Sequence, residues 1–288
     1  MELKESKQEV RESVARARAA GKTIGFVPTM GALHDGHRSL IAASAADCRY
    51  TVVSIFVNPT QFGPGEDFER YPRGLGRDLR AAEDAGADLV FAPSVEEIYP
   101  LGFTTFLEVG ELGEVLCGAS RPGHFRGVAT VVAKLLNIVR PDGLYLGRKD
   151  AQQAIILTRM IRDLDFDVEV RVLPTVREPD GLAMSSRNRY LSARQRTSAS
   201  LLSAALSSAG ELFEGKERDV KRLLAAARNV LGQEKELVVE YLEARDAESL
   251  AEVSRVECKT LLALAARIGE TRLIDNVLLD PETGSFDE

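Results

Sequence analysis

The sequence is poor in the residues that build disulfide frameworks and cysteine-based zinc sites. It has three cysteines, an odd number, and none of them stands in a C-x-x-C pair. They lie far apart, at Cys48, Cys117 and Cys258, so neither a disulfide scaffold nor a cysteine zinc site is expected. Such sparse cysteine usage is typical of a reducing compartment and predicts a cytoplasmic protein.

Long apolar runs and an excess of positive charge are also missing. No segment reaches the ~18 consecutive apolar residues of a membrane span, and residues 1–22, which are charged throughout, lack the apolar core of a signal peptide. The 288 residues carry a formal net charge of -7 and a pI of about 5.3, with no long basic run. Nucleic acid and membranes are therefore not expected partners.

The residues that are abundant predict a globular α/β protein. Hydrophobic residues make up 44% of the chain, enough for a sizeable core. Short β-branched runs alternate with longer segments of helical periodicity up to about residue 177, and this alternation predicts a Rossmann-like, doubly wound parallel sheet. The expected strands are 23–29, 51–59, 87–93, 143–147 and 168–176, and the expected helices are 37–48, 75–85, 127–139 and 151–164.

The pattern changes after Val176. A polar loop leads into expected helices at 192–213 and 219–231, and three strand-like runs follow. Helices followed by strands predict a smaller C-terminal α+β domain. The predicted domains are therefore 1–176, which would bind the small molecules, and 177–288, which would act as a lid.

The stretch PTMGALHDGHRSL, residues 28–40, holds two of the three histidines. It follows an apolar strand and precedes a helix, and Gly31 and Gly36 permit a tight turn. A helix amino terminus suits an anion, and the imidazoles of His34 and His37 could donate hydrogen bonds to phosphate. Two exposed loop histidines are the plainer alternative. A zinc site is less favoured, because no third ligand is evident.

Polar residues follow other predicted strands as well. Asn58 and Gln61 suit a polyhydroxy or carboxylate ligand, although turn chemistry explains them equally well. His124 would more often be a structural histidine, while Arg126 could hold a carboxylate.

Two later segments are suited to phosphate. In GRKDAQQ, residues 147–153, Lys149 is a compact cation, and Asp150 is placed either to cap the next helix or to orient Lys149. The hydroxyls and guanidinium of residues 185–187 favour a mobile clamp over bound nucleotide, with an ordinary polar linker as the alternative.

Six segments, in this order, carry a resemblance to a known family. They are PTMGALHDGH (28–37), FVNPTQF (56–62), ERYPR (69–73), CGASRPGHFRGVATVV (117–132), GRKDAQQ (147–153) and MSSRNRYL (184–191). Over almost its whole length the chain resembles the pantoate–β-alanine ligase (pantothenate synthetase) family. That family belongs to the nucleotidylyltransferase superfamily, which has a HIGH-type signature and a mobile KMSKS-like loop to which MSSRN is similar.

The resemblance implies an ATP-dependent ligase. Pantoate's carboxylate would attack the α-phosphate of ATP, with Mg²⁺ as cofactor, to form pantoyl adenylate and pyrophosphate. The amine of β-alanine would then release pantothenate and AMP. Such chemistry needs positioning and charge stabilisation rather than a protein nucleophile. The resemblance also implies a homodimer.

The resemblance further implies roles for single residues. The catalytic residues would be His34, His37, Lys149 and Arg187, with His37 as the proton donor. Pantoate would bind Gln61 and Gln153, and β-alanine would bind Gln61. Asn58, Tyr71, His124 and Arg126 would line the same cleft. The residues that would contact ATP are Met30, Gly31, Ala32, Leu33, His34, Asp35, Gly36, His37, Gly147, Arg148, Lys149, Asp150, Val176, Met184, Ser185, Ser186 and Arg187.

Two positions depart from the family pattern. Arg148 stands where the family often has Glu or Gln, and its role stays open. After ERYPR, where acidic residues are common in the family, only Asp78 remains, so a magnesium contact from this stretch is not expected and the metal ligands stay unassigned. The alternatives are a related nucleotidylyltransferase and a catalytically inactive nucleotide-binding protein. The paired glutamines and the intact histidines argue for the ligase.

Overall fold

The computed structural model describes residues 1–287 and forms two compact units that interleave along the chain. The first unit consists of Met1–Glu114, Arg121–Arg148 and Ile156–Leu173. The second consists of Val115–Ser120, Lys149–Ile155 and Pro174–Glu288. Among the helices of the described residues, none has the length and apolar character needed to cross a membrane.

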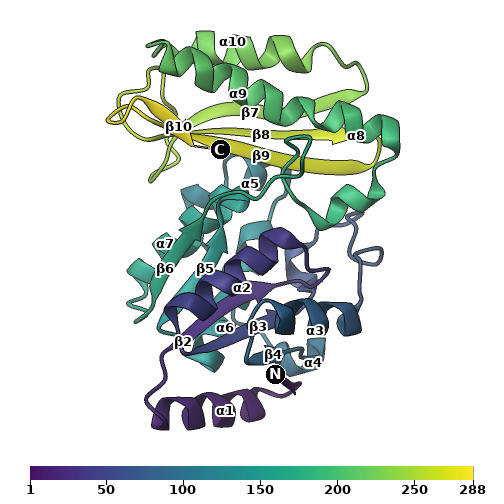
Figure 1. Ribbon diagram of the computed structural model, residues 1–288, viewed down its shortest axis with the longest axis vertical. Coiled ribbons are helices and arrows are strands. Elements are labelled where there is room, and N and C mark those ends of the chain that lie inside the picture. Colours follow the sequence, from purple (N-terminus) through teal and green to yellow (C-terminus); the bar gives the residue numbers. More distant parts are fainter. Residues whose placement is uncertain (288) are drawn as a thin grey trace. The chain divides into compact units, whose positions relative to one another are not determined.

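The first unit is built on a parallel sheet with the strand order β1-β4-β3-β2-β5-β6 (Figure 1). Its strands are β1 (Glu2–Lys4), β2 (Ile24–Thr29), β3 (Tyr50–Ile55), β4 (Leu89–Phe91), β5 (Gly143–Gly147) and β6 (Glu169–Leu173). Strands β2 to β5 are almost entirely buried, as a parallel sheet covered on both faces requires. The predicted Rossmann-like sheet is confirmed.

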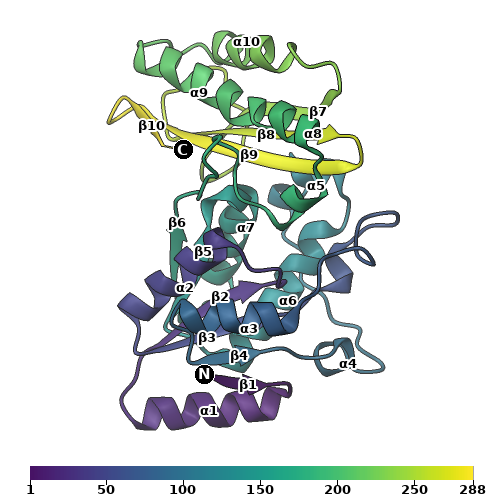
Figure 2. The ribbon, with the colours of Figure 1, turned by 45° about the vertical axis from the view of Figure 1, so that its right-hand side comes forward.

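Helices cover both faces of this sheet (Figure 2). They are α1 (Lys7–Ala19), α2 (Asp35–Asp47), α3 (Leu75–Asp84), α4 (Val95–Ile98), α6 (His124–Val139) and α7 (Ala151–Asp163). Helix α2 packs on β2, β3 and β5 and contacts α3, whereas α1 contacts α6. Right-handed crossovers place these two pairs on opposite faces, and the winding direction reverses at β2. The carboxyl end of β2 is therefore the switch point at which open α/β sheets bind ligands.

The second unit is a smaller α+β structure, as predicted. Helices α9 (Leu201–Glu214) and α10 (Val220–Leu231) pack against each other and against an antiparallel sheet of order β10-β9-β8-β7. The strands are β7 (Leu237–Asp246), β8 (Thr260–Ile268), β9 (Thr271–Asp280) and β10 (Ser285–Asp287). The short helices α5 (Cys117–Ser120) and α8 (Ala193–Ala199) belong to this unit too.

Two features differ from the sequence-based expectation. Strand β1 and helix α1 were not predicted, yet α1 begins with a capping box between Ser6 and Glu9 and buries Val10, Val14 and Ala17 on one face. The single helix expected over 192–213 is wrong: α8 ends at Ala199 and α9 begins at Leu201. The hydroxyl of the intervening Ser200 donates to a carbonyl of the preceding turn, a contact that bends helices.

Candidate active site

The segment 30–34 joins the carboxyl end of β2 to α2. The Thr29 hydroxyl donates to the Ser54 carbonyl and accepts from the Gly31 amide, at 2.7 and 3.1 Å. Gly31 and Ala32 are both in the left-handed region, at φ 80° and 51°. This double turn reverses the chain so that α2 begins beside the switch point, where its free amino-terminal N–H groups favour an anion.

The two histidines of this segment lie together at the start of α2. Their ring centroids are 4.1 Å apart, and the His34 amide donates to Nδ1 of His37 at 3.4 Å. When Nδ1 of a neutral imidazole accepts a hydrogen bond, its proton is on Nε2. His37 is thereby oriented to donate through Nε2, which is the arrangement that a phosphate-handling histidine needs.

The Gln61 side chain contacts the same segment. It lies in the 3₁₀ turn η1 (Pro59–Gln61), and its Nε2 is 3.2 Å from the sulfur of Met30. Its carboxamide oxygen accepts from Nδ2 of Asn58 at 3.0 Å. Asn58 is fully buried, also donates to the Gly127 carbonyl, and accepts from the Tyr99 hydroxyl at 2.8 Å. Burial raises the pKa of Tyr99, which keeps this hydroxyl a donor.

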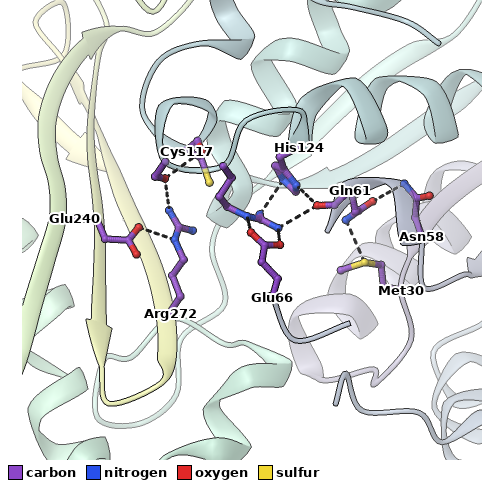
Figure 3. Close-up of polar contacts among 10 residues, drawn as sticks. Met30, Asn58, Gln61, Glu66, Cys117, His124, Glu240 and Arg272 are labelled. Atoms are coloured by element: carbon purple, nitrogen blue, oxygen red, sulfur yellow. Dashed lines mark hydrogen bonds and ion pairs between the residues drawn. The ribbon is translucent and has the colours of Figure 1, made fainter. Parts of the chain in front are cut away.

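A second set of contacts holds the Gln61 backbone (Figure 3). Its carbonyl accepts from Nδ1 of His124 at 2.8 Å and from the Arg121 guanidinium at 3.2 Å. Arg121 makes a bidentate pair with Glu66, at 2.7 and 2.6 Å, and its other terminal nitrogen is 3.1 Å from Nε2 of His124. Burial works against ionisation of Glu66, but the hydrogen bonds and charge of Arg121 outweigh it and lower the pKa of this carboxyl.

Three other residues of these motifs have structural contacts. Arg126 stacks on the Phe106 ring and pairs with Glu108 at 3.5 Å. Tyr71 is buried, with its ring edge towards Phe62. Gly127 lets α6 approach η1 closely, because a Cβ there would lie 2.3 Å from the Thr60 carbonyl oxygen. The motif RPGHFRG therefore supports the Gln61 turn.

In the second unit, two adjacent polar residues of β9 anchor two of the predicted nucleotide-binding segments. Asn276 donates from Nδ2 to the Lys149 carbonyl at 3.0 Å. Asp275 accepts two hydrogen bonds from Arg177, at 2.7 and 3.2 Å. Both β9 residues are 3% exposed. Burial raises the pKa of Asp275, and the Arg177 charge partly offsets that effect.

The sequence contains a signal for these two anchors. An Asp–Asn pair interrupts the otherwise apolar stretch LIDNVLL, residues 273–279, and buried polar groups in a strand need partners. Lys149 itself is in η3 (Arg148–Asp150), which follows β5 and Gly147, and its Nζ lies 3.6 Å from the Asp150 carboxylate. Arg148 is half-buried in the same turn.

The loop that contains Met184–Arg187 has its own set of contacts. The Met184 amide donates to the Val176 carbonyl at 2.9 Å, and the Ser185 hydroxyl accepts from the Arg187 amide at 3.2 Å. Ser186, which is buried, begins the 3₁₀ helix η4 (Ser186–Tyr190). The loop thus presents the half-buried side chains of residues 184, 185 and 187 around a local turn.

The two glutamines of GRKDAQQ have different surroundings. Gln152 is buried, accepts from the Cys117 amide at 2.9 Å and donates to the Val115 carbonyl at 2.8 Å. Gln153 is half-buried one position on, which on a helix turns its side chain by about 100°. Gln152 is therefore structural, whereas Gln153 presents its carboxamide in another direction.

Helix α5 is further tied to β9 within the second unit (Figure 3). The Ser120 hydroxyl donates to the Cys117 carbonyl at 3.1 Å and lies 3.3 Å from the Arg272 guanidinium. Arg272 also pairs with Glu240 at 2.7 Å. These contacts hold the short segment that precedes α6 within the second unit.

Across residues 1–287 there is no group of three or more His, Cys, Asp or Glu side chains arranged to hold a metal ion. Asp78, the one acidic residue left after ERYPR, is 5% exposed, and each of its oxygens accepts a backbone N–H.

Comparison with known proteins places these motifs in one family. The family model described as pantoate–β-alanine ligase matches residues 2–278. A pantothenate synthetase of Moorella thermoacetica is 52% identical over 280 residues, which cover 97% of this chain and 99% of the relative. A pantothenate synthetase of Acidobacterium capsulatum is 57% identical over 265 residues, covering 92% of this chain and 89% of the relative.

Comparison with solved structures indicates the same family. The crystal structure of pantothenate synthetase from Thermus thermophilus matches with a TM-score of 0.93 at 45% identity, covering 98% of this chain and 100% of that one. A pantoate–β-alanine ligase from Francisella tularensis, solved in complex with β,γ-ATP and β-alanine, matches with a TM-score of 0.78 at 34% identity, covering 96% and 97% of the two chains.

Proposed function

The chain belongs to the pantoate–β-alanine ligase family, and on that premise we propose that it condenses pantoate with β-alanine at the expense of ATP. A pantoate carboxylate oxygen attacks the α-phosphorus, and the bond to the β-phosphate oxygen breaks to release pyrophosphate. The β-alanine nitrogen then attacks the acyl carbon of pantoyl adenylate. The carbon–oxygen bond breaks, AMP leaves with its electron pair, and the nitrogen loses a proton.

The observation that carries this proposal is the histidine pair at the switch point with the Gln61 carboxamide beside it. His37, with its proton on Nε2, donates to the phosphate oxygens as negative charge builds on them, and His34 acts beside it. The amino terminus of α2 adds its free N–H groups. Residues 30–37 therefore form the part of the site that handles the ATP phosphates.

We assign the other nucleotide contacts to residues 147–150, Val176 and residues 184–187. Lys149 and Arg187 supply the cations for the phosphate charge. Support comes from the backbone contacts that hold each segment: the Asn276 bond to the Lys149 carbonyl, and the Ser185 cap on the Arg187 amide. Val176 uses its backbone beside the adenine.

We assign pantoate to Gln61 and Gln153, and β-alanine to Gln61. Both are half-buried or buried carboxamides, able to bind hydroxyl and carboxylate groups without adding charge. The contacts of Asn58 and His124 fix the side chain and backbone of Gln61, so they act by positioning it. Any bound Mg²⁺ would offset part of the negative charge of the ATP phosphates.

A coupled assay of AMP release tests the function. AMP and pyrophosphate are expected only when pantoate is present, and pantothenate only when β-alanine is added as well. Formation of ADP and phosphate would overturn the adenylate mechanism. A stable nucleotidyl product with no need for an amine would indicate a related nucleotidylyltransferase, and ATP binding without turnover would indicate an inactive nucleotide-binding protein.

We also propose that the protein is a cytoplasmic homodimer. The cysteines at 48, 117 and 258 are free thiols, which fits a reducing compartment. Strand β6 ends the parallel sheet, and its Val172 is 46% exposed, which gives one apolar edge for association. Light scattering should give twice the chain mass of 31.4 kDa. A monomer at micromolar concentration would contradict the dimer.

A further inference from the structure

Helix α3 contributes one buried carboxylate to the turn before the histidine pair. Oδ2 of Asp78 accepts the Ala32 amide and Oδ1 accepts the Leu33 amide, both at 2.9 Å. Asp78 is in the first turn of α3, and only 5% of it is exposed. The two oxygens therefore hold two consecutive backbone N–H groups, 46 and 45 residues away in sequence, out of contact with water.

These N–H groups belong to a turn that needs support. Ala32 is at φ 51°, a region that side chains other than glycine rarely adopt. Gly31, at φ 80°, has no room for a side chain, because a Cβ would lie 3.0 Å from Asp78 Oδ2 and from Ile55 Cγ2. A strained conformation of this kind persists only where its surroundings fix it. Here the Asp78 carboxylate is packed directly under the turn.

The charge of Asp78 is unexpected at this place on electrostatic grounds. A negative group beneath a loop that binds phosphates repels them, and the repulsion is strong where little water screens it. A residue retained only for its charge would here weaken ATP binding. The hydrogen bonds instead indicate that Asp78 positions the turn, since only a carboxylate accepts two parallel N–H groups with both oxygens.

We propose that Asp78 is a positioning residue for adenylate formation: it fixes the double turn at Gly31 and Ala32 and thereby the His34–His37 pair, and it is not a magnesium ligand. The proposal rests on the proposed function of residues 30–37. Asp78 is only 5% exposed and each of its oxygens faces a backbone N–H, whereas Mg²⁺ requires oxygens that are open to octahedral coordination at about 2.0–2.1 Å.

Asp78→Asn tests the proposal, because the amide keeps the size of the side chain but turns one acceptor into a donor facing an N–H group. Asp88→Asn is the matched control. Asp88 also accepts a backbone N–H, from Thr51 at 2.8 Å, but at the amino-terminal end of β3. The measurements are kcat and KM for ATP in the AMP-release assay, the Mg²⁺ concentration for half-maximal rate, and the melting temperature.

Asp78→Asn should lower kcat by about 10- to 100-fold, as expected when reacting groups are displaced, with the Mg²⁺ midpoint unchanged. Asp88→Asn should stay within about twofold of the unmodified protein. Ala32→Gly, added to Asp78→Asn, should restore part of the rate because glycine tolerates the left-handed turn. Equal rates for the two Asn variants would overturn the positioning role. A rate loss that excess Mg²⁺ repairs would instead identify a metal ligand.

Hydrogen exchange of the intact protein gives a second, independent measurement. The amides of Ala32 and Leu33 should exchange as slowly as those of β2, although they lie outside any strand or helix. Fast exchange would overturn the proposal even if Asp78→Asn fails to fold. If the unmodified protein releases no AMP, the proposed function fails, while the exchange result still decides whether Asp78 holds the turn.

Discussion

The two loops assigned to the ATP phosphates are held in opposite ways. The turn at Gly31–Leu33 is fixed by a buried carboxylate that bonds directly to its backbone. The loop around residues 184–188 has backbone bonds too, but it is also tied by a chain of side chains that begins where Asn188 donates to the Glu178 carboxylate at 2.6 Å. Glu178 in turn pairs with Arg196 at 2.5 Å.

The difference lies in the access of water to these contacts. The Arg196 and Glu178 side chains are 32% and 21% exposed, so water can replace each partner at low cost, and such pairs contribute only about 0–1 kcal/mol. Water cannot replace the hydrogen bonds of Asp78 in this way, because the side chain is buried. We therefore expect the first loop to stay fixed and the second to exchange its contacts more readily.

The second loop nevertheless has a rigid base. Arg177 donates to the Gly181 carbonyl at 3.1 Å and to Asp275, which is buried in β9. The chain therefore enters the loop from a fixed point.

Asp275→Ala should have the largest effect, because it removes the base of the second loop. It removes the carboxylate that pairs with the Arg177 guanidinium, which is 13% exposed, and breaking a buried pair in this way costs about 3–5 kcal/mol. The measurement is the free energy of unfolding in urea, followed by circular dichroism. Glu236→Ala, which removes the exposed 2.8 Å pair with Arg194, should cost less than about 1 kcal/mol.

A double variant sharpens this prediction. Asp275→Leu combined with Arg177→Met removes both charges, and apolar replacement of a buried pair is often neutral or stabilising. It should recover most of the stability that Asp275→Ala loses. If Asp275→Ala lowers the free energy of unfolding no more than Glu236→Ala does, the Arg177–Asp275 pair is not a rigid base for the second loop.

His37→Ala and Lys149→Ala should each lower turnover by on the order of 10²-fold or more, as removal of one transition-state donor typically does. Both variants should keep the far-ultraviolet circular dichroism of the folded protein, because neither side chain supports the core. Lys259→Ala is the control, since Lys259 also pairs with a carboxylate, Asp280 at 3.1 Å, but lies outside the proposed site. Rates like those of the unmodified protein would contradict the roles assigned to His37 and Lys149.

The sequence predicted most of the fold because its signals were local. Apolar runs at 23–29 and 143–147 predicted β2 and β5 within one residue, and the alternation of runs and helices predicted the doubly wound sheet. The sequence does not predict helix α1, because its apolar face is narrow and consists mostly of Val and Ala among charged residues. Its stability depends on packing against α6, which no local pattern reports.

The supports of the site were harder to predict than its motifs. Asp78, Asn276 and Glu66 lie 45, 127 and 55 residues from the groups they hold, Leu33, Lys149 and Arg121. Bonds over such distances depend on the folded topology, and a single sequence does not reveal them. The motifs identified the groups suited to phosphate and carboxylate, whereas the structure identifies what holds several of them in place.

Arg196→Ala should have a smaller effect than the loss of either buried anchor, because it breaks only the exposed outer contacts of the second loop. Besides Glu178, it removes the 2.9 Å pair with Asp180. We expect a loss of stability of about 1 kcal/mol or less and a rise of a few-fold in KM for ATP, with kcat nearly unchanged. Arg194→Ala is the control on the same helix. A fall in kcat as large as that of His37→Ala would show that this loop is as rigid as the first.

The smallest predicted effect is on the stability of the protein at acidic pH. Because Arg121 lowers the folded-state pKa of Glu66 below its ordinary value of 4.5, the pair adds stability above that value and loses it as pH falls through the folded pKa. Glu66→Gln should therefore be less stable than the unmodified protein at neutral pH, and the difference should shrink as the pH falls below 4.5. Glu108→Gln, at the exposed 3.5 Å pair with Arg126, should show a much weaker dependence. A constant difference between Glu66→Gln and the unmodified protein across this range would mean that shape alone, without charge, holds the Gln61 backbone.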